Sequence, residues 1–177
     1  MTPTAFAFLL PETWSEYDLT GRDLARAHAR AREAATTDAE RAAVDDTYGQ
    51  AGELLRSFVG QGALAAAGII EPHDEGLLIA FVAVFGVTGA DDLRGMSIVD
   101  LPGVGRGFRS SGTRTVTLPG AQVPVFTMTT AIPVPAHPDR LLLVTAISPN
   151  VAEATLLTGL FETVTGTLRF LAPSTER

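Results

Sequence analysis

The stretch GLLIAFVAVFGV, residues 76 to 87, contains only glycine and apolar side chains. A strand with one face in water alternates apolar and polar residues, and this stretch shows no such alternation. A strand that is apolar on both faces has to be covered on both faces. We therefore expect it to lie in the middle of a sheet, with helices or another layer on each side.

The sequence on both sides of this stretch extends the predicted sheet. GII at 68–70 leads through the turn-rich EPHDEG into the central stretch, which predicts a hairpin. Because proline cannot donate to a ladder, Pro124 and Pro133 are expected at exposed, edge or bulged positions. Further strands, separated by the turns PGAQ and PAHPD, are predicted at 113–118, 123–134 and 140–147.

The N-terminal third reads as a strand followed by helices. AFAFLL at 5–10 is apolar and is followed by Pro11, which predicts a first strand. Ala, Arg and Glu dominate from Thr20 to Ala35, and a second helix is expected from Asp38. Four glycines predict a break or kink between residues 49 and 62. We treat 20–67 as one helical insertion.

Two later patterns also predict helices. GADDLRGMSIV at 89–99 has acidic residues where a helix N-terminus favours them. For the closing helix, Asn150 is expected to cap and Glu153 to reach back, as in a capping box. Its apolar stripe is predicted to consist of Leu156, Leu157, Leu160, Phe161, Val164 and Leu168.

The order of these elements predicts the fold class. The order is one early strand, a long helical region, a block of strands and a closing helix. This order excludes strict βαβ alternation. We expect an α+β fold, a three-layer α/β/α sandwich on a mainly antiparallel sheet, with a long N-terminal helical segment and a C-terminal helix. No repeat or linker marks a second domain, so residues 1–177 are expected to form a single domain.

Three pieces in a fixed order carry a family resemblance. They are FAFLLPETW at 6–14, IPVPAHPDRLLLVTAISPN at 132–150 and LFETVTGTLRF at 160–170. Together they resemble the PsbP-like superfamily, which includes the photosystem II extrinsic protein, the Ran-binding import factor Mog, the DcrB-like proteins and many actinobacterial chains. A strand that ends in Leu-Pro shortly before a Trp is typical of that group, as is a closing helix after Ser-Pro-Asn.

This resemblance implies a fold and a broad kind of function. It implies an α/β/α sandwich on an antiparallel sheet, and members that are mostly non-enzymatic binding or assembly proteins. Some DcrB-like members resemble chaperones that hold apolar segments of secreted effectors. The chain departs from the better-known members by its helical insertion at 20–67, and fold alone does not define function.

Composition excludes several function classes. The net charge is −7 with a pI near 4.9, which argues against nucleic acid as a partner because phosphate binding needs Lys and Arg. The chain has no cysteine, so disulfides and thiolate chemistry are excluded. We expect no membrane span, because the longest apolar run is shorter than the roughly 20 residues a spanning helix needs. No secretory signal is evident, and a cytoplasmic protein is expected.

The glycine-rich stretch LPGVGRGFRSSG at 101–112 resembles a phosphate loop only superficially. A nucleotide fingerprint places its glycines between a strand and a helix N-terminus, whereas the segment that follows here reads as a strand. We expect a strand and turn inside the sheet, with Phe108 pointing inward. Arg106 and Arg109 should face opposite sides unless a bulge at Gly107 resets the alternation.

No catalytic or metal-binding constellation emerges from the remaining polar residues. The three histidines, at 28, 73 and 137, lack a second ligand at a metal-site spacing. Ser110, Ser111 and Ser148 have no nearby histidine, and the pairs Asp45/Asp46 and Asp91/Asp92 are adjacent residues in predicted helices, which do not face each other. We predict no catalytic residue, no metal and no cofactor.

The sequence therefore favours a non-enzymatic protein-binding adaptor or chaperone-like domain. The alternative is a carrier of a small apolar ligand in a pocket between the sheet and the 20–67 region. Trp14 is the single tryptophan; it either packs over the end of the sheet or contacts a partner, because Trp is enriched in interface hot spots. Self-association into a symmetric dimer is a further expectation, since low surface charge leaves apolar area exposed.

Overall fold

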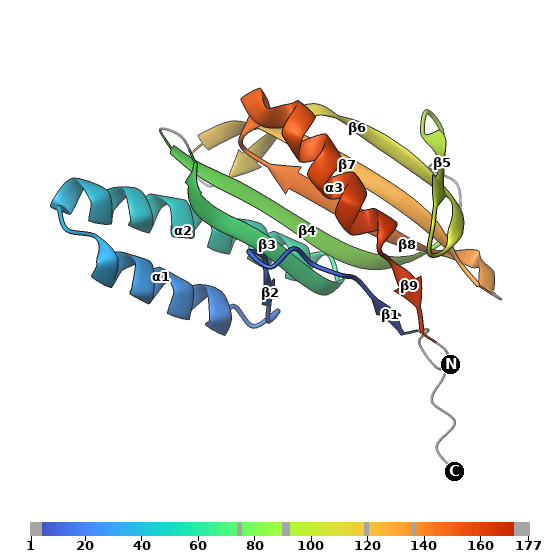
Figure 1. Cartoon of the computed structure of the whole chain (residues 1–177), viewed down its shortest axis with the longest axis horizontal. Helices are drawn as coiled ribbons and strands as arrows, with labels where there is room; N and C mark the ends of the chain where they lie inside the picture. The colour runs from blue at the N-terminus through green and yellow to red at the C-terminus, as the bar shows by residue number, and fades with distance from the viewer. Residues whose placement is uncertain (1–4, 74–75, 90–92, 119–120, 136, 172–177) are drawn as a thin grey trace, which may run out of the picture.

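A seven-stranded antiparallel sheet forms the centre of the protein. The computed structural model describes residues 5–73, 76–89, 93–118, 121–135 and 137–171. Within them the sheet has the order β2-β3-β4-β8-β7-β6-β5 (Figure 1). These strands are β2 Ser15–Tyr17, β3 Ala63–His73, β4 Gly76–Thr88, β5 Ser97–Leu101, β6 Gly105–Leu118, β7 Ala121–Val134 and β8 His137–Ser148. The α+β class and the mainly antiparallel sheet are thereby confirmed.

The apolar stretch 76–87 forms the interior strand β4, as predicted. It pairs with β3 in the predicted hairpin and with β8 on its other side. Val82 and Val84 belong to one hydrophobic cluster, whereas Phe81 and Ala83 belong to a second one. Since neighbouring residues of a strand point to opposite faces, the sheet has a core on each face.

The closing helix α3 (Ala154–Gly166) covers one of these faces (Figure 1). A 3₁₀ turn, η1 (Val151–Glu153), precedes it. Leu157, Phe161 and Val164 are buried in the predicted stripe. Leu156 is 49% exposed, so its place in the stripe is corrected; it falls on the outer side of the helix.

The predicted capping box at Asn150 is wrong, because this side chain bonds to the sheet instead. Its Oδ1 accepts from the Ile79 N–H at 2.9 Å, and its Nδ2 donates to the Leu77 carbonyl at 2.8 Å. The backbone N–H of Asn150 donates to the Ser148 hydroxyl. Asn150 thus connects the start of the helical segment to strand β4.

Two helices, α1 (Arg22–Ala34) and α2 (Asp38–Gly60), follow β2 (Figure 1). Ala51, Leu55 and Phe58 of α2 are buried in the second cluster. Of the break or kink expected between residues 49 and 62, the structure shows the end of the helix: α2 continues through Gly49 and Gly52 and ends at Gly60. Burial of one side of the helix compensates for the low helix propensity of glycine.

The boundary predicted for the helical insertion is also corrected. Residues 63–67 belong to strand β3, so the helical region ends at Gly60 and not at residue 67. Alanine has the highest helix propensity of all residues, which made this alanine-rich segment resemble a helix. Pairing with β2 and β4 overrides that propensity.

The helix expected over 89–99 is corrected as well. Residues 90–92 lie outside the described part of the chain, and β5 occupies Ser97–Leu101. The glycine-rich stretch that follows is a hairpin, as predicted, with its turn between Leu101 and Gly105. Gly105 has a φ of 87°, and a Cβ at Gly103 would overlap the carbonyl oxygen of Leu168. Both glycines are therefore structural.

The β5–β6 register is continuous, with no bulge at Gly107. Arg106 and Arg109 therefore face opposite sides of the sheet, and they cannot bind one anion together. Phe108 is half-buried and belongs to neither core cluster, so the expectation that it points into the core is wrong. Pro124 and Pro133 were expected at exposed, edge or bulged positions. Both are exposed, and the β7–β8 register shifts directly after Pro133.

The N-terminal segment, residues 5–10, does not join the main sheet, which corrects the strand expected there. Only β1 (Phe6–Ala7) is a strand, and it pairs with β9 (Arg169–Phe170) in a separate two-stranded sheet. The rest of the segment is extended chain that crosses the face of the main sheet also covered by α3 (Figure 1).

Candidate binding site

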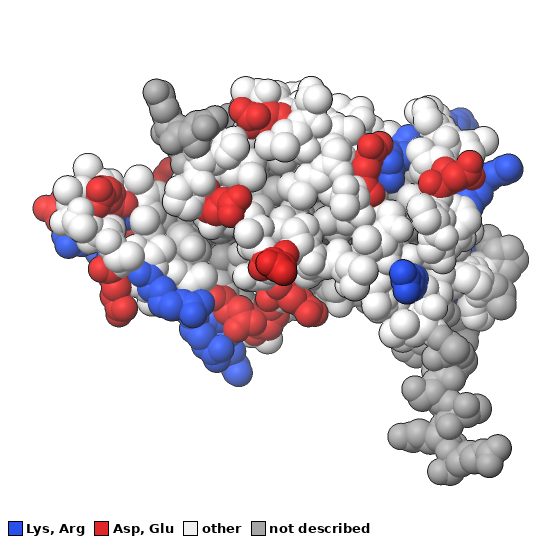
Figure 2. Space-filling model, in the orientation of Figure 1, with Lys and Arg blue, Asp and Glu red and all other residues white. Residues whose placement is uncertain are grey.

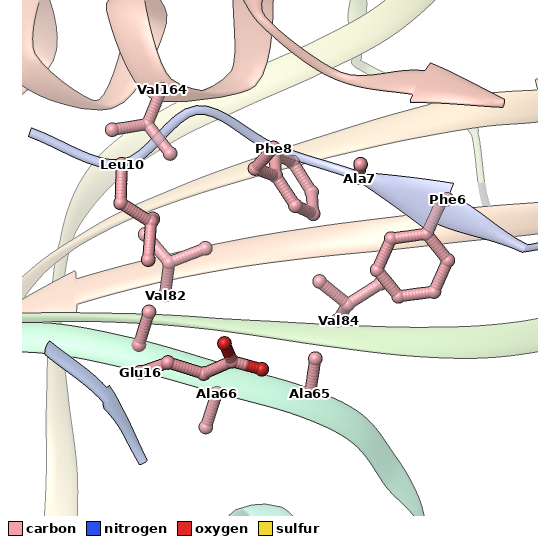
Figure 3. A pocket seen from close by; sticks show the side chains of 11 residues that line it. Phe6, Ala7, Phe8, Leu10, Glu16, Ala65, Ala66, Val82, Val84 and Val164 are labelled. Carbon is pink, nitrogen blue, oxygen red and sulfur yellow. The ribbon is translucent and has the colours of Figure 1, made fainter. Parts of the chain in front are cut away.

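An apolar pocket lies between the N-terminal segment and the main sheet (Figure 3). It encloses about 340 Å³, within the range of roughly 300–1,000 Å³ that small-molecule sites occupy. The middle of this face of the molecule is largely uncharged, and many of the charged side chains lie over α1 and α2 (Figure 2). The pocket is lined by Phe6, Ala7, Phe8, Leu10, Glu16, Ala65, Ala66, Ala67, Val82, Val84 and Val164.

The N-terminal segment forms the roof of the pocket. Phe6, Phe8 and Leu10 are half-buried and point toward the sheet, whereas the residues between them are exposed (Figure 3). This is the alternation of an extended chain. The segment is bonded to the chain after α3: the Leu9 N–H donates to the Thr167 hydroxyl at 3.0 Å, and the Leu171 N–H donates to the Ala5 carbonyl at 2.8 Å.

Small side chains form the floor of the pocket. Ala65 and Ala67 of β3 point to the same face as Val82 and Val84 of β4. Larger residues at the alanine positions would fill the space below the aromatic rings of the roof. The small residues of ALAAAG at 63–68 are the sequence feature that could have indicated this pocket. Because alanine has a high helix propensity, the same residues predict part of a helix.

One ionisable side chain, Glu16, lines the pocket. It lies on β2 opposite Ala67, and directly opposed residues of an antiparallel pair point to the same face. Its carboxylate makes no hydrogen bond or ion pair with any residue in the described part of the chain. The pocket therefore combines an apolar interior with a single unpaired negative charge.

This arrangement can bind a ligand that has an apolar part and a cationic part. The lining holds no nucleophile and no second acid or base that could exchange a proton with Glu16. An apolar group would bind by leaving water, and a cationic group on the same ligand would meet the carboxylate.

Trp14 lies beside this region but inside the core. Its side chain is 7% exposed and packs edge-to-face on Phe161, with ring centroids 6.4 Å apart. The interpretation that Trp14 packs over the sheet agrees with this position. The core that contains α3 covers most of the indole, and the partner-contact interpretation of Trp14 stays a prediction.

Two other hollows lie where the alternative prediction placed a pocket, between the sheet and the helical region. One, between α2 and the strands, encloses only about 40 Å³, too little for a ligand. The other is an open depression of about 450 Å³ beside the β3–β4 hairpin. Its carboxylate, Glu40, already accepts hydrogen bonds from Thr36 and Thr37.

The structure also places the polar residues that sequence analysis considered. His28 Nε2 lies 2.7 Å from Asp45 Oδ1, and the His28 ring stacks on Tyr48, so this group joins α1 to α2. Burial raises the pKa of Tyr48. Ser148 is buried and donates to the Ile79 carbonyl, while Asp91 and Asp92 lie outside the described residues.

These observations define the class of the molecule, an α+β protein with an open apolar pocket on an antiparallel sheet. Among the described residues, no group of three His, Asp or Glu side chains lies close enough to hold a metal ion. The helices of that part of the chain are too short or too polar to cross a membrane. Comparison with family models finds no match for the chain, and comparison with curated proteins finds none either.

Proposed function

We propose that this protein is a non-enzymatic binding protein that holds a small apolar ligand carrying a cationic group. The observation that carries this proposal is the unpaired Glu16 carboxylate beside a pocket of about 340 Å³ with otherwise apolar walls. The proposed site lies between the N-terminal segment and the main sheet, and not under helices α1 and α2.

The energetics favour a ligand with both features. Each buried methylene group contributes roughly 0.8 kcal/mol. Glu16 is exposed, so a cation beside it adds only about 0–1 kcal/mol. The apolar chain would therefore supply most of the affinity, and the carboxylate would supply the preference for a cation over an anion.

Octylamine, octanol and octanoate test this proposal because they share one alkyl chain and differ in charge. Binding is followed by the methyl NMR signals of Val82 and Val84 during titration. We expect octylamine to bind more tightly than octanoate, with octanol between them. Absence of saturable shifts at these methyl groups with all three probes would contradict the proposal.

Two variants and one control variant connect the result to the pocket. Glu16→Gln should remove the difference between octylamine and octanoate and keep the binding of octanol. Glu12→Gln changes the net charge equally at an exposed position outside the pocket and should preserve that difference. Ala65→Leu should weaken binding of all three probes, because the added side chain occupies the floor.

A protein-binding adaptor or chaperone-like role is the second candidate. Its support is the set of large apolar side chains that stay exposed, including Leu64 at 54% and Ile98 at 62%. Pull-down with purified candidate partners and light scattering for a symmetric dimer test it. A strict monomer at high concentration would contradict self-association.

We also propose that the chain is a PsbP-like three-layer α/β/α sandwich with a long N-terminal helical segment, and that it works in the cytoplasm. The support for the layers is the pair of core clusters, one containing α3 and the other containing α2, on the two faces of the sheet. The motifs FAFLLPETW and LFETVTGTLRF, which suggested the superfamily, both contribute to the cluster that contains α3.

A further inference from the structure

Strand β6 extends well beyond its neighbour β5. The last β5–β6 pair is Ser97↔Arg109, whereas β6 continues to Leu118. On its other side β6 pairs with β7 over its whole remaining length. Residues 110–118, the free edge of β6, thus have no strand on their outer side among the described residues (Figure 1).

The backbone of this free edge is available for pairing. In an antiparallel strand alternate residues point their N–H and C=O groups to opposite sides, so part of those groups point away from β7. Residues 110–115 and Thr117 are exposed. The free edge contains no proline and no bulge, two features that usually protect an edge strand, and Arg114 is its one charged side chain.

The side chains on one face of the free edge define what would fit beside it. Val116 packs against the cluster that contains α2, and Arg114, two residues before it, points to the same face. Arg114 is exposed and makes no ion pair within the described residues. A Cβ placed at Gly112, the next position on this face, would meet no atom within 4 Å.

We propose that the free edge of β6 binds an extended segment of a partner protein as an additional antiparallel strand. The segment would carry an apolar residue beside Val116 and, two residues later, an acidic residue beside Arg114. Main-chain hydrogen bonds would supply affinity, and the two side chains would supply specificity. The inference deepens the protein-binding alternative and does not depend on the apolar pocket.

Charge argues for a different protein and against a second copy. Full antiparallel overlap of two 110–118 edges would place Arg114 opposite Arg114, and like charges directly opposite are destabilising. An acidic residue in the added strand would instead pair with the only charged residue of the free edge.

The test uses two fluorescein-labelled peptides and the full chain. One has the sequence Thr-Val-Thr-Val-Thr-Glu-Thr-Val-Thr, and the other has Lys in place of Glu. Fluorescence anisotropy should show the Glu peptide binding about three- to tenfold more tightly. Arg114→Glu should reverse that preference. Arg106→Glu is the matched control. It makes the same charge change on the same face of β6, but at a position where β5 already occupies the edge, so the variant should keep the preference for the Glu peptide.

A second measurement tests strand addition itself. Two further peptides are N-methylated at either the odd-numbered or the even-numbered residues, so each lacks the backbone N–H donors of one edge of the strand. Only the peptide that lacks the N–H groups facing β6 should bind more weakly, by about tenfold or more, because several main-chain hydrogen bonds disappear. Binding should also slow amide hydrogen exchange between Ser111 and Thr117.

Three outcomes would overturn the proposal. The first is the absence of saturable binding of either peptide. The second is an equal loss of binding for both sets of N-methylated peptides. The third is a dimer in light scattering that Thr115→Pro dissociates, since this result would assign the free edge to a second copy. None of them affects the octylamine titration, so failure here is distinguishable from failure of the pocket proposal.

Discussion

The guanidinium group of Arg109 on β6 lies 2.8 Å from the carboxylate of Glu162 on α3. It also donates to the Thr165 and Thr130 hydroxyls at 2.9 and 3.1 Å. The Arg109 side chain is only 12% exposed. One arginine of the glycine-rich stretch thus connects the outer part of the sheet to the helix that covers it.

Arg109→Ala should destabilise the protein by about 1–3 kcal/mol, because it removes hydrogen bonds to a charged partner and leaves the Thr130 hydroxyl without its donor. Urea denaturation followed by circular dichroism measures the change. Arg106→Ala, an exposed position on the opposite face, is the control and should change stability much less. Equal effects of the two variants would contradict a structural role for Arg109.

Gly103→Ala should destabilise the protein, because the new Cβ would collide with the backbone carbonyl of Leu168 and force the β5–β6 turn away from the end of α3. A loss of about 1–3 kcal/mol is expected for such overpacking. Gly112→Ala adds the same methyl group where no atom lies within 4 Å and should be nearly neutral. Thermal melts of the two variants compare them directly.

Asn150→Ala should cost about 1–3 kcal/mol, since it leaves the Ile79 N–H and the Leu77 carbonyl without their side-chain partner. Asn150→Asp keeps an acceptor for Ile79 but places a carboxylate oxygen against the Leu77 carbonyl, so a loss at least as large as that of Asn150→Ala is expected. If Asn150 acted only as a helix cap, Asn150→Asp would match the wild type in urea denaturation.

The central sheet could be predicted from sequence because its signal is local. Residues 76–87 are apolar on both faces and β-branched or aromatic at several positions, a pattern that favours an interior strand. The candidate pocket could not be predicted in the same way. Its floor depends on Ala65 and Ala67, whose propensity favours a helix, and its roof depends on a segment that pairs only with the far end of the chain.

The same distinction between local and long-range signals explains the caps. Thr37 and Glu40 are three residues apart at the start of α2 and form a capping box. Asn150 and Glu153 have the same spacing and do not, because β4 offers Asn150 two backbone partners distant in sequence. Spacing alone cannot show which partner a side chain will take.

The capping box of α2 also predicts a pH dependence. Hydrogen bonds from the Thr36 hydroxyl, and then from the Thr36 and Thr37 backbone N–H groups, lower the pKa of Glu40 below its ordinary value of 4.5. A lowered pKa means that the folded state favours the carboxylate, so the stabilisation is present above pH 4.5 and is lost as the pH falls through the folded-state pKa.

Glu40→Gln cannot ionise, so the stability difference between wild type and this variant should shrink as the pH is lowered from neutral to below 4.5 in urea denaturation. Glu33→Gln removes an exposed carboxylate of α1 that makes no hydrogen bond within the described residues, and it is the charge-matched control. A Glu40→Gln difference that stays constant over the whole range would mean that the capping box holds the carboxylate no more tightly in the folded state than in the unfolded chain.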